Sequence, residues 1–286
     1  MRRVALGVLL VALALPLAAC GGSSSVSADM RSVAQAATKT EDAGSARFEL
    51  SVDAKGLPGQ SAGAGFTAQG AVDYESQRST MTVDLGSLAG LFGQAGESAE
   101  DTSIEMLVDG KVVYMKFPLL SGLIGQGKPW LKMDVEKLAA ETGQDLGELA
   151  QVNRGDPTQA LAYLKAAGDF EAVGSEQVRG VATTHHKGAI DIRKALDQVS
   201  GDQKAQLEKL LNESGVTELP AEAWIDGDGY LRKMTLAFAG LTGASEVGFD
   251  VAMELFDFGA EVDVQLPPDD EVTDISELLT KGELTP

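Results

Sequence analysis

The sequence has a single cysteine, Cys20, among its 286 residues. A disulfide within the chain is therefore excluded, and the folded part must be stabilised by its core alone. Histidines number two, aromatic residues make up 5% of the chain, and 23 basic residues face 43 acidic ones. A net charge of −20 excludes the basic surface that nucleic acids require, so no nucleic-acid partner is expected.

A hydrophobic run long enough to span a bilayer comfortably is also missing near the N-terminus. The apolar stretch there, Val4 to Leu17, is too short, and it follows Arg2 and Arg3. A short apolar run after basic residues, ending in small residues, is typical of a signal peptide. We therefore predict that residues 1–19 are a signal peptide that is removed.

The end of this stretch, Leu17-Ala18-Ala19-Cys20 followed by Gly21 to Ser25, resembles the lipobox of bacterial lipoproteins. The resemblance implies cleavage before Cys20, a diacylglyceryl thioether on its sulfur and a further acyl chain such as palmitate on the new amino terminus. Two or more acyl chains hold a protein stably on a membrane, whereas one does so only marginally. We expect a protein anchored through Cys20 to the outer face of the cell membrane, with residues 20–28 as a lipidated flexible leader. An ordinary secretory signal with an incidental cysteine is the alternative.

Beyond the leader, a helix is predicted from Ser27 or Asp29 to about Gly44 because its apolar residues have helical spacing. Apolar and polar residues then alternate with period two, the pattern of a strand buried on one side. Alternation begins at 47–54 and recurs at 66–74, 80–85, 104–108, 112–117, 130–133, 169–178, 181–192, 219–226, 230–239 and 246–257. Turns are predicted at Asp109-Gly110, Arg179-Gly180 and Gly227 to Gly229.

Helices are predicted in the middle of the chain, around 135–140, 146–152 and from Asp156, where Leu161 and Leu164 would face inward. About eleven strands joined mainly by hairpins, with few helices, indicate an α+β fold with one large antiparallel sheet. So few helices cover so many one-sided strands only if the sheet curves around them. We therefore predict a half-barrel, as a single domain at residues 29–266 followed by an acidic C-terminal tail at 267–286.

Three segments carry a resemblance to a known family: Trp130 to Asp134, the helix opened by Asp156-Pro157, and Val178 to His186. On a lipobox leader, this order resembles the LppX/LprG lipoproteins of actinobacteria, whose domain is similar to the lipoprotein carrier LolA. The resemblance covers most of residues 29–266. It implies a LolA-like half-barrel around a cavity for acyl chains of lipids or glycolipids in transit through the envelope. A helical insert around 200–215 and the acidic tail depart from the family pattern.

The residues that would line such a cavity share the apolar faces of their strands. They are Phe48, Leu50, Val52, Met81, Val83, Met106, Val108, Met234, Leu236, Phe249, Val251 and Met253. Taken alone, such faces more often form plain core than a ligand pocket, and it is the resemblance that favours the pocket. The methionines suit an adaptable wall because their side chains are unbranched and polarizable, although they also fill ordinary cores.

Two sequence motifs suggest chemistry, but their contexts do not support it. Gly59-Gln60-Ser61-Ala62-Gly63 matches the nucleophile elbow of hydrolases, yet it lies in a glycine-rich loop that a strand follows, where the elbow requires a helix. Residues 122–128 nearly match a phosphate-binding P-loop, yet Pro129 replaces the hydroxyl residue that would hold magnesium.

His185 and His186, the two histidines, are adjacent on a predicted strand and so point to opposite faces, which prevents them from sharing one metal ion. Asp226 and Asp228 flank a tight turn, which explains both without calcium. We expect no catalytic residue, no cofactor and no metal site.

The sequence therefore predicts a membrane-anchored, non-enzymatic lipoprotein that binds lipid or glycolipid acyl chains and carries them across the envelope. The alternative is a sensor or scaffold lipoprotein that binds another envelope protein. A hydrolase that uses Ser61 is a third hypothesis.

Overall fold

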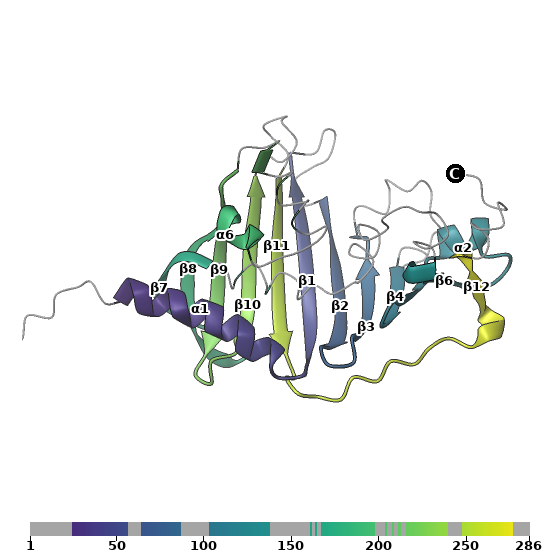
Figure 1. Ribbon diagram of the computed structural model, residues 1–286, viewed down its shortest axis with the longest axis horizontal. Helices are drawn as coiled ribbons and strands as arrows, with labels where there is room; N and C mark the ends of the chain where they lie inside the picture. The colour runs from purple at the N-terminus through teal and green to yellow at the C-terminus, as the bar shows by residue number, and fades with distance from the viewer. Residues whose placement is uncertain are drawn as a thin grey trace, which may run out of the picture.

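The computed structural model describes residues 25–56, 64–86, 103–137, 161, 164, 167–197, 204, 208, 211–212, 216–239 and 248–276 (Figure 1). Helix α1 (Ser25–Glu41) comes first, where the sequence predicts a helix. The described residues contain no helix long and apolar enough to cross a membrane. Cys20, Ser61 and most of the predicted helices at 135–160 and 200–215 lie outside the described residues.

Two antiparallel meanders build the sheet. The first consists of β1 (Ser45–Lys55), β2 (Ala64–Asp73), β3 (Arg78–Asp84), β4 (Ser103–Asp109), β5 (Val112–Lys116) and β6 (Trp130–Asp134). The second consists of β7 (Ala167–Val178), β8 (Val181–Asp191), β9 (Glu218–Asp226), β10 (Leu231–Ala239) and β11 (Gly248–Phe256). Two short helices, α2 (Pro118–Ile124) and α6 (Ile192–Leu196), follow β5 and β8.

The two meanders join where β11 pairs with β1, so the last long strand lies beside the first. The sheet order is β12-β6-β5-β4-β3-β2-β1-β11-β10-β9-β8-β7. The fold is α+β, with one open sheet of 12 strands, one more than the sequence predicts. All its strand pairs are antiparallel except one, which β6 makes with the C-terminal strand β12 (Val272–Asp274).

A long strap, residues 257–271, connects β11 to β12 along one end of the sheet (Figure 1). Near the start of the strap, the Ala260 carbonyl accepts a hydrogen bond from Ser45 Oγ at 2.5 Å. The 3-10 helix η3 (Asp269–Glu271) ends the strap. At its far end, Lys128 Nζ donates to the Val272 carbonyl at 2.8 Å and Thr273 Oγ1 to the Gly125 carbonyl at 2.6 Å. Residues 272–274, which the sequence places in the acidic tail, thus extend the sheet.

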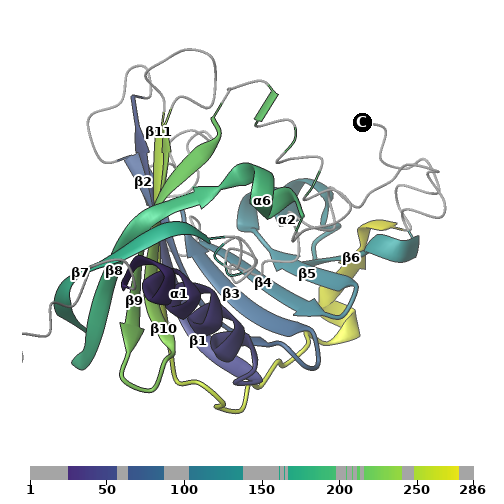
Figure 2. The same cartoon turned by 60° about the vertical axis from the view of Figure 1, so that its left-hand side comes forward.

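The sheet bends so that β7 and β8 turn toward α1, which lies in the hollow (Figure 2). Helix α1 packs mainly on β7, with further contacts to β9 and β10. Its buried residues Val33, Ala36 and Ala37 are small, which lets the helix approach the strands closely. Thr40 in its last turn is fully buried and accepts a hydrogen bond from the Leu231 amide at 3.0 Å. The sheet curves, as predicted, and α1 packs inside the curve on β7, β9 and β10.

The hairpin turns follow the residues that tolerate positive φ. Arg179 and Gly180 have φ of 50° and 80°, so the predicted β7–β8 turn has the primed geometry that suits strand twist. The β4–β5 turn differs by one residue, because Asp109 pairs with Val112 and the loop is Gly110-Lys111. Only the first of these two residues has a positive φ, 60° at Gly110, so the predicted Asp109-Gly110 turn is wrong in register.

Candidate functional site

Cross-strand pairing aligns the apolar side chains into rows on the inner face, the face that α1 covers. The central row across the first meander contains Phe48, Gly70, Met81, Met106, Met115 and Leu131, one from each of β1 to β6. We call it the methionine row, since three neighbouring strands each contribute a methionine to it. A row on one side of it contains Leu50, Ala68, Val83 and Ile104.

Gly70 gives the methionine row its shape. A Cβ added there would collide with the ring of Phe48 and with the backbone oxygen of Thr80. The Phe48 ring therefore lies over the space where a side chain of β2 would stand, and it fills the gap between β1 and Met81. A glycine in the middle of a strand is explained here by the close approach of an aromatic ring.

The inner face has a filled half and a thinner half. Under α1, strands β7 to β11 and β1 contribute to one large cluster, which includes Phe48, Met234 and Met253 and also the fully buried Leu161 and Leu164. Over β2 to β6, the buried residues that the structure describes form small clusters, apart from Val72 of β2, which belongs to the large one. Half-buried side chains pack at the edge of these small clusters: Leu50, Phe66, Met81, Ile104 and Met115.

The structure brings all twelve predicted cavity residues to the inner face. Buried in the filled half lie Phe48, Met234, Leu236 and Met253. Buried in the thinner half lie Val83, Met106 and Val108, and the half-buried ones are Leu50, Val52, Met81, Phe249 and Val251. Sequence reasoning omitted Phe66, Met115 and Phe117 from this set, although the alternation along 112–117 already places Met115 and Phe117 on one face.

The opposite, outer face is polar and carries grooves. One groove of about 500 Å³ is lined by Glu49, Ser51, Gln69, Asp84 and Glu254, among others. A neighbouring groove of about 480 Å³ shares Glu49 and Gln69 with it. Most residues that line these two grooves point to the face away from α1, although Leu50 contributes to the first groove and Phe48 and Met81 contribute to the second.

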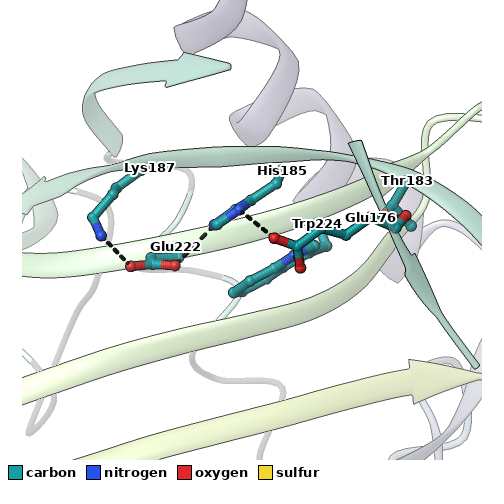
Figure 3. Close-up of polar contacts among 6 residues, drawn as sticks. All are labelled: Glu176, Thr183, His185, Lys187, Glu222 and Trp224. Carbon is teal, nitrogen blue, oxygen red and sulfur yellow. Dashed lines mark hydrogen bonds and ion pairs between the residues drawn. The ribbon is translucent and has the colours of Figure 1, made fainter. Parts of the chain in front are cut away.

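His185 occupies the centre of a polar cluster on the outer face (Figure 3). Its Nδ1 lies 3.1 Å from Glu176 Oε1 on β7, and its Nε2 lies 2.8 Å from Glu222 Oε2 on β9. The ring stacks on Trp224, with centroids 4.2 Å apart. Hydrogen bonds from Lys187 and His185 hold the pKa of Glu222 below its ordinary value, although partial burial acts in the opposite direction.

Arg179 makes a second connection from the β7–β8 hairpin to the body of the sheet. Its guanidinium donates to Glu254 at 2.9 Å, binds Glu49, and lies 4.0 Å from the centroid of the Phe256 ring. The hydrogen bond and ion pair with Glu49 raise the pKa of Arg179 above its ordinary value. The turn of the hairpin is thus fixed to β11 and β1 by a group that stays charged.

The motifs that suggest chemistry have structural explanations where they are described. Residues 122–128 join the end of α2 to β6, the reverse of the loop-to-helix order of a P-loop, and Lys128 binds strap carbonyls. Asp226 Oδ1 accepts from the amides of Asp228 and Tyr230, which makes it the cap of the β9–β10 turn. His185 and His186 lie on opposite faces, and the described part of the chain contains no group of three acidic, histidine or cysteine side chains suited to a metal ion.

No protein-family model matches the chain. A curated relative, an uncharacterised 31.2 kDa protein of Streptomyces griseus, is 31% identical over 165 residues, which are 56% of this chain and 52% of the relative. The chain thus spans about half the length of this relative.

Solved structures of lipoproteins resemble the chain. The match to LppX of Mycobacterium tuberculosis covers 84% of this chain and 99% of LppX, with a TM-score of 0.47 and 14% identity. The match to LprF of Mycobacterium bovis covers 85% and 99%, with a TM-score of 0.46 and 18% identity. A LolA-superfamily protein of Nitrosomonas europaea matches at a TM-score of 0.30 and 8% identity over 88% of this chain and 99% of its own. The resemblance noted in the sequence is thus found among solved structures.

Proposed function

We propose that this chain is an extracytoplasmic lipoprotein, anchored through Cys20, that binds acyl chains of a lipid or glycolipid on the inner face over β2 to β5. The observation that carries the proposal is the difference between the two halves of that face. In the filled half, most of the described apolar side chains belong to one large buried cluster under α1, and Val52, Phe249 and Val251 are half-buried beside it. On the thinner half, the described side chains of Phe66, Met81, Ile104 and Met115 remain half-buried, and the half-buried Leu50 of β1 packs beside them.

The chemistry of the methionine row suits a hydrocarbon chain. Met81, Met106 and Met115 follow one another across three strands, so a chain laid across the strands would meet flexible thioethers along its path. Burying a chain of sixteen carbons recovers roughly 13 kcal/mol relative to water, at about 0.8 kcal/mol per methylene. A bilayer offers the acyl chain the same gain. The protein would therefore act by lowering the free-energy barrier for moving the chain through water, and this role requires no catalytic residue.

The direct test is to identify what the purified protein holds. The chain expressed without residues 1–19 should copurify with lipid, detected by mass spectrometry of an organic extract and of the intact protein under native conditions. A fluorescent fatty acid should bind the delipidated protein. An extract without lipid, together with no binding of the fatty-acid probe, would exclude the acyl-chain proposal.

A pair of neighbouring substitutions locates the site. Met81 is half-buried on the inner face and Thr82, the next residue of β3, is exposed on the outer face. Met81→Lys places a charge among apolar side chains and should weaken binding of the fatty acid roughly tenfold or more. Thr82→Lys adds the same charge to the same strand and should leave binding unchanged. Equal binding by both variants, with thermal melts confirming their folding, would place the ligand elsewhere.

Cys20 provides an independent test of the anchor. Cells fed a labelled palmitate analogue should incorporate the label into the wild-type protein, and Cys20→Ala should abolish incorporation because the thioether can no longer form. The variant should also leave the membrane fraction, since the acyl chains provide the anchoring energy. Persistence of the label on Cys20→Ala would refute lipidation at this residue.

The grooves on the outer face favour a second candidate, in which the chain binds another envelope protein. Five acidic side chains line the two neighbouring grooves: Glu49, Asp84, Glu254, Glu261 and Asp263. Crosslinking from Asp84→Cys in living cells would distinguish the candidates. A single crosslinked envelope protein, with no lipid in the purified chain, would favour the scaffold over the carrier.

A further inference from the structure

His185 connects three strands on the outer face, and its geometry depends on its protonation state. Both ring nitrogens lie within hydrogen-bond distance of carboxylate oxygens, 3.1 Å from Glu176 and 2.8 Å from Glu222. An ionised carboxylate only accepts hydrogen bonds, so each contact needs a proton on the facing nitrogen. The neutral imidazole carries one proton and satisfies one contact, whereas the imidazolium satisfies both.

The surroundings hold the imidazole ring in this position. Its side chain is 13% exposed and lies flat on Trp224, at an interplanar angle of 10°. Trp224 Nε1 donates to Glu176 Oε2 at 2.9 Å, so the same carboxylate receives two donors. The other charged groups of the cluster are Lys187 on β8, 2.8 Å from Glu222, and Lys233 on β10, 5.0 Å from the Trp224 ring. The ring therefore keeps its position while its proton count changes.

We propose that His185 is a pH-sensitive clasp that holds edge strand β7 to β8 and β9 when its imidazole is protonated and loosens β7 around Glu176 when it is neutral. The clasp goes beyond the proposed function and does not depend on a lipid ligand. Strand β7 ends the sheet and packs on α1, so its attachment controls how firmly this edge closes over the helix.

The geometry also limits the extent of the loosening. Arg179 binds Glu254 and Glu49 from the turn of the same hairpin, and its guanidinium stays charged. The turn should therefore stay attached while the stretch near Glu176 opens. Histidine is the side-chain type whose ordinary change of charge falls between pH 5 and pH 8. His186, the second histidine, is buried on the inner face.

Hydrogen exchange of the β7 amides tests the clasp in the intact protein. After correction for the intrinsic exchange rate, protection of amides near Glu176 should fall roughly fivefold from pH 6 to pH 8, in line with the loss of one charge-assisted hydrogen bond. His185→Gln, which is neutral throughout, should remove this pH dependence. Glu171→Gln, a change at an exposed acidic residue of the same strand, should retain it. Wild-type protection that does not change with pH, or a His185→Gln variant that keeps the change, would overturn the proposal.

The protonation state itself is measurable without a variant. Nitrogen NMR of the wild-type imidazole should show both ring nitrogens of His185 protonated at pH 6 and a single protonated tautomer at pH 8. A single tautomer at both values would overturn the clasp, even if His185→Gln failed to fold.

Discussion

Replacing Phe48 by alanine is expected to lower the free energy of unfolding by about 3–5 kcal/mol, the range for removing a buried aromatic ring from a core. Phe48 is fully buried, and its ring occupies the space left by Gly70 at the junction of the filled and thinner halves. The backbones of β1 and β2 are held by their ladder, so the cavity cannot collapse fully. Urea denaturation followed by tryptophan fluorescence should show a lower midpoint with an unchanged slope.

Phe66 provides the matched control for this substitution. The substitution Phe66→Ala removes the same atoms as Phe48→Ala, but from a half-buried position on the neighbouring strand β2. Phe66→Ala should therefore lose clearly less stability than Phe48→Ala, because less apolar surface returns to water. Equal losses at the two positions would contradict the division of the inner face into two halves.

Replacing Asp226 by alanine is expected to cost about 3–5 kcal/mol, because it leaves a partly buried arginine without its partner. The Asp226 side chain is 2% exposed and binds Arg232 Nε at 2.6 Å. It also accepts from the amides of Asp228 and Tyr230, which lose their acceptor in the variant. The midpoint of thermal unfolding should fall, most clearly when compared with Asp228→Ala.

Asp228 lies two residues away in the same turn, and both of its printed contacts, the amide that donates to Asp226 and the carbonyl that accepts from Lys39, come from its backbone. Asp228→Ala should change the free energy of unfolding by less than about 0.5 kcal/mol, as exposed substitutions usually do. Asp226→Asn should lie between the two, because the amide oxygen can still cap the turn while the ion pair is lost. An Asp228→Ala variant as unstable as Asp226→Ala would refute this assignment.

Much of the fold follows from local patterns. The side chains of Phe48, Leu50 and Val52 alternate with polar ones, and a strand with period two has no other way to bury them together. The turn at Arg179-Gly180 follows from an equally local pattern, since these two residues separate two stretches of alternating polar and apolar residues. The Gly110-Lys111 turn was misplaced by one residue because Asp and Gly both tolerate positive φ, and only the pairing of Asp109 with Val112 decides between the two positions.

Other features depend on contacts between distant segments, which no local pattern encodes. Three residues, Val272 to Asp274, pair with β6 only because the strap reaches that edge and Lys128 binds it there. The polar cluster around His185 was not predicted from the sequence, since its partners Glu176 and Glu222 lie on two other strands and meet it only through the sheet register. Likewise, the twelve inner-face residues could be chosen from their alternation, but their division between a filled and a thinner half depends on where α1 packs.

The described sheet begins with β12 and ends with β7, and both strands are unsuited to pairing with another molecule. Strand β12 has three residues, and β7 carries two irregularities in its pairing with β8 together with the exposed acidic residues Glu171 and Glu176. Short, kinked and like-charged strands resist pairing between molecules. If many copies are anchored side by side on one cell surface, their local concentration is high. The edge strands β7 and β12 would then keep the copies from pairing edge to edge into fibrils.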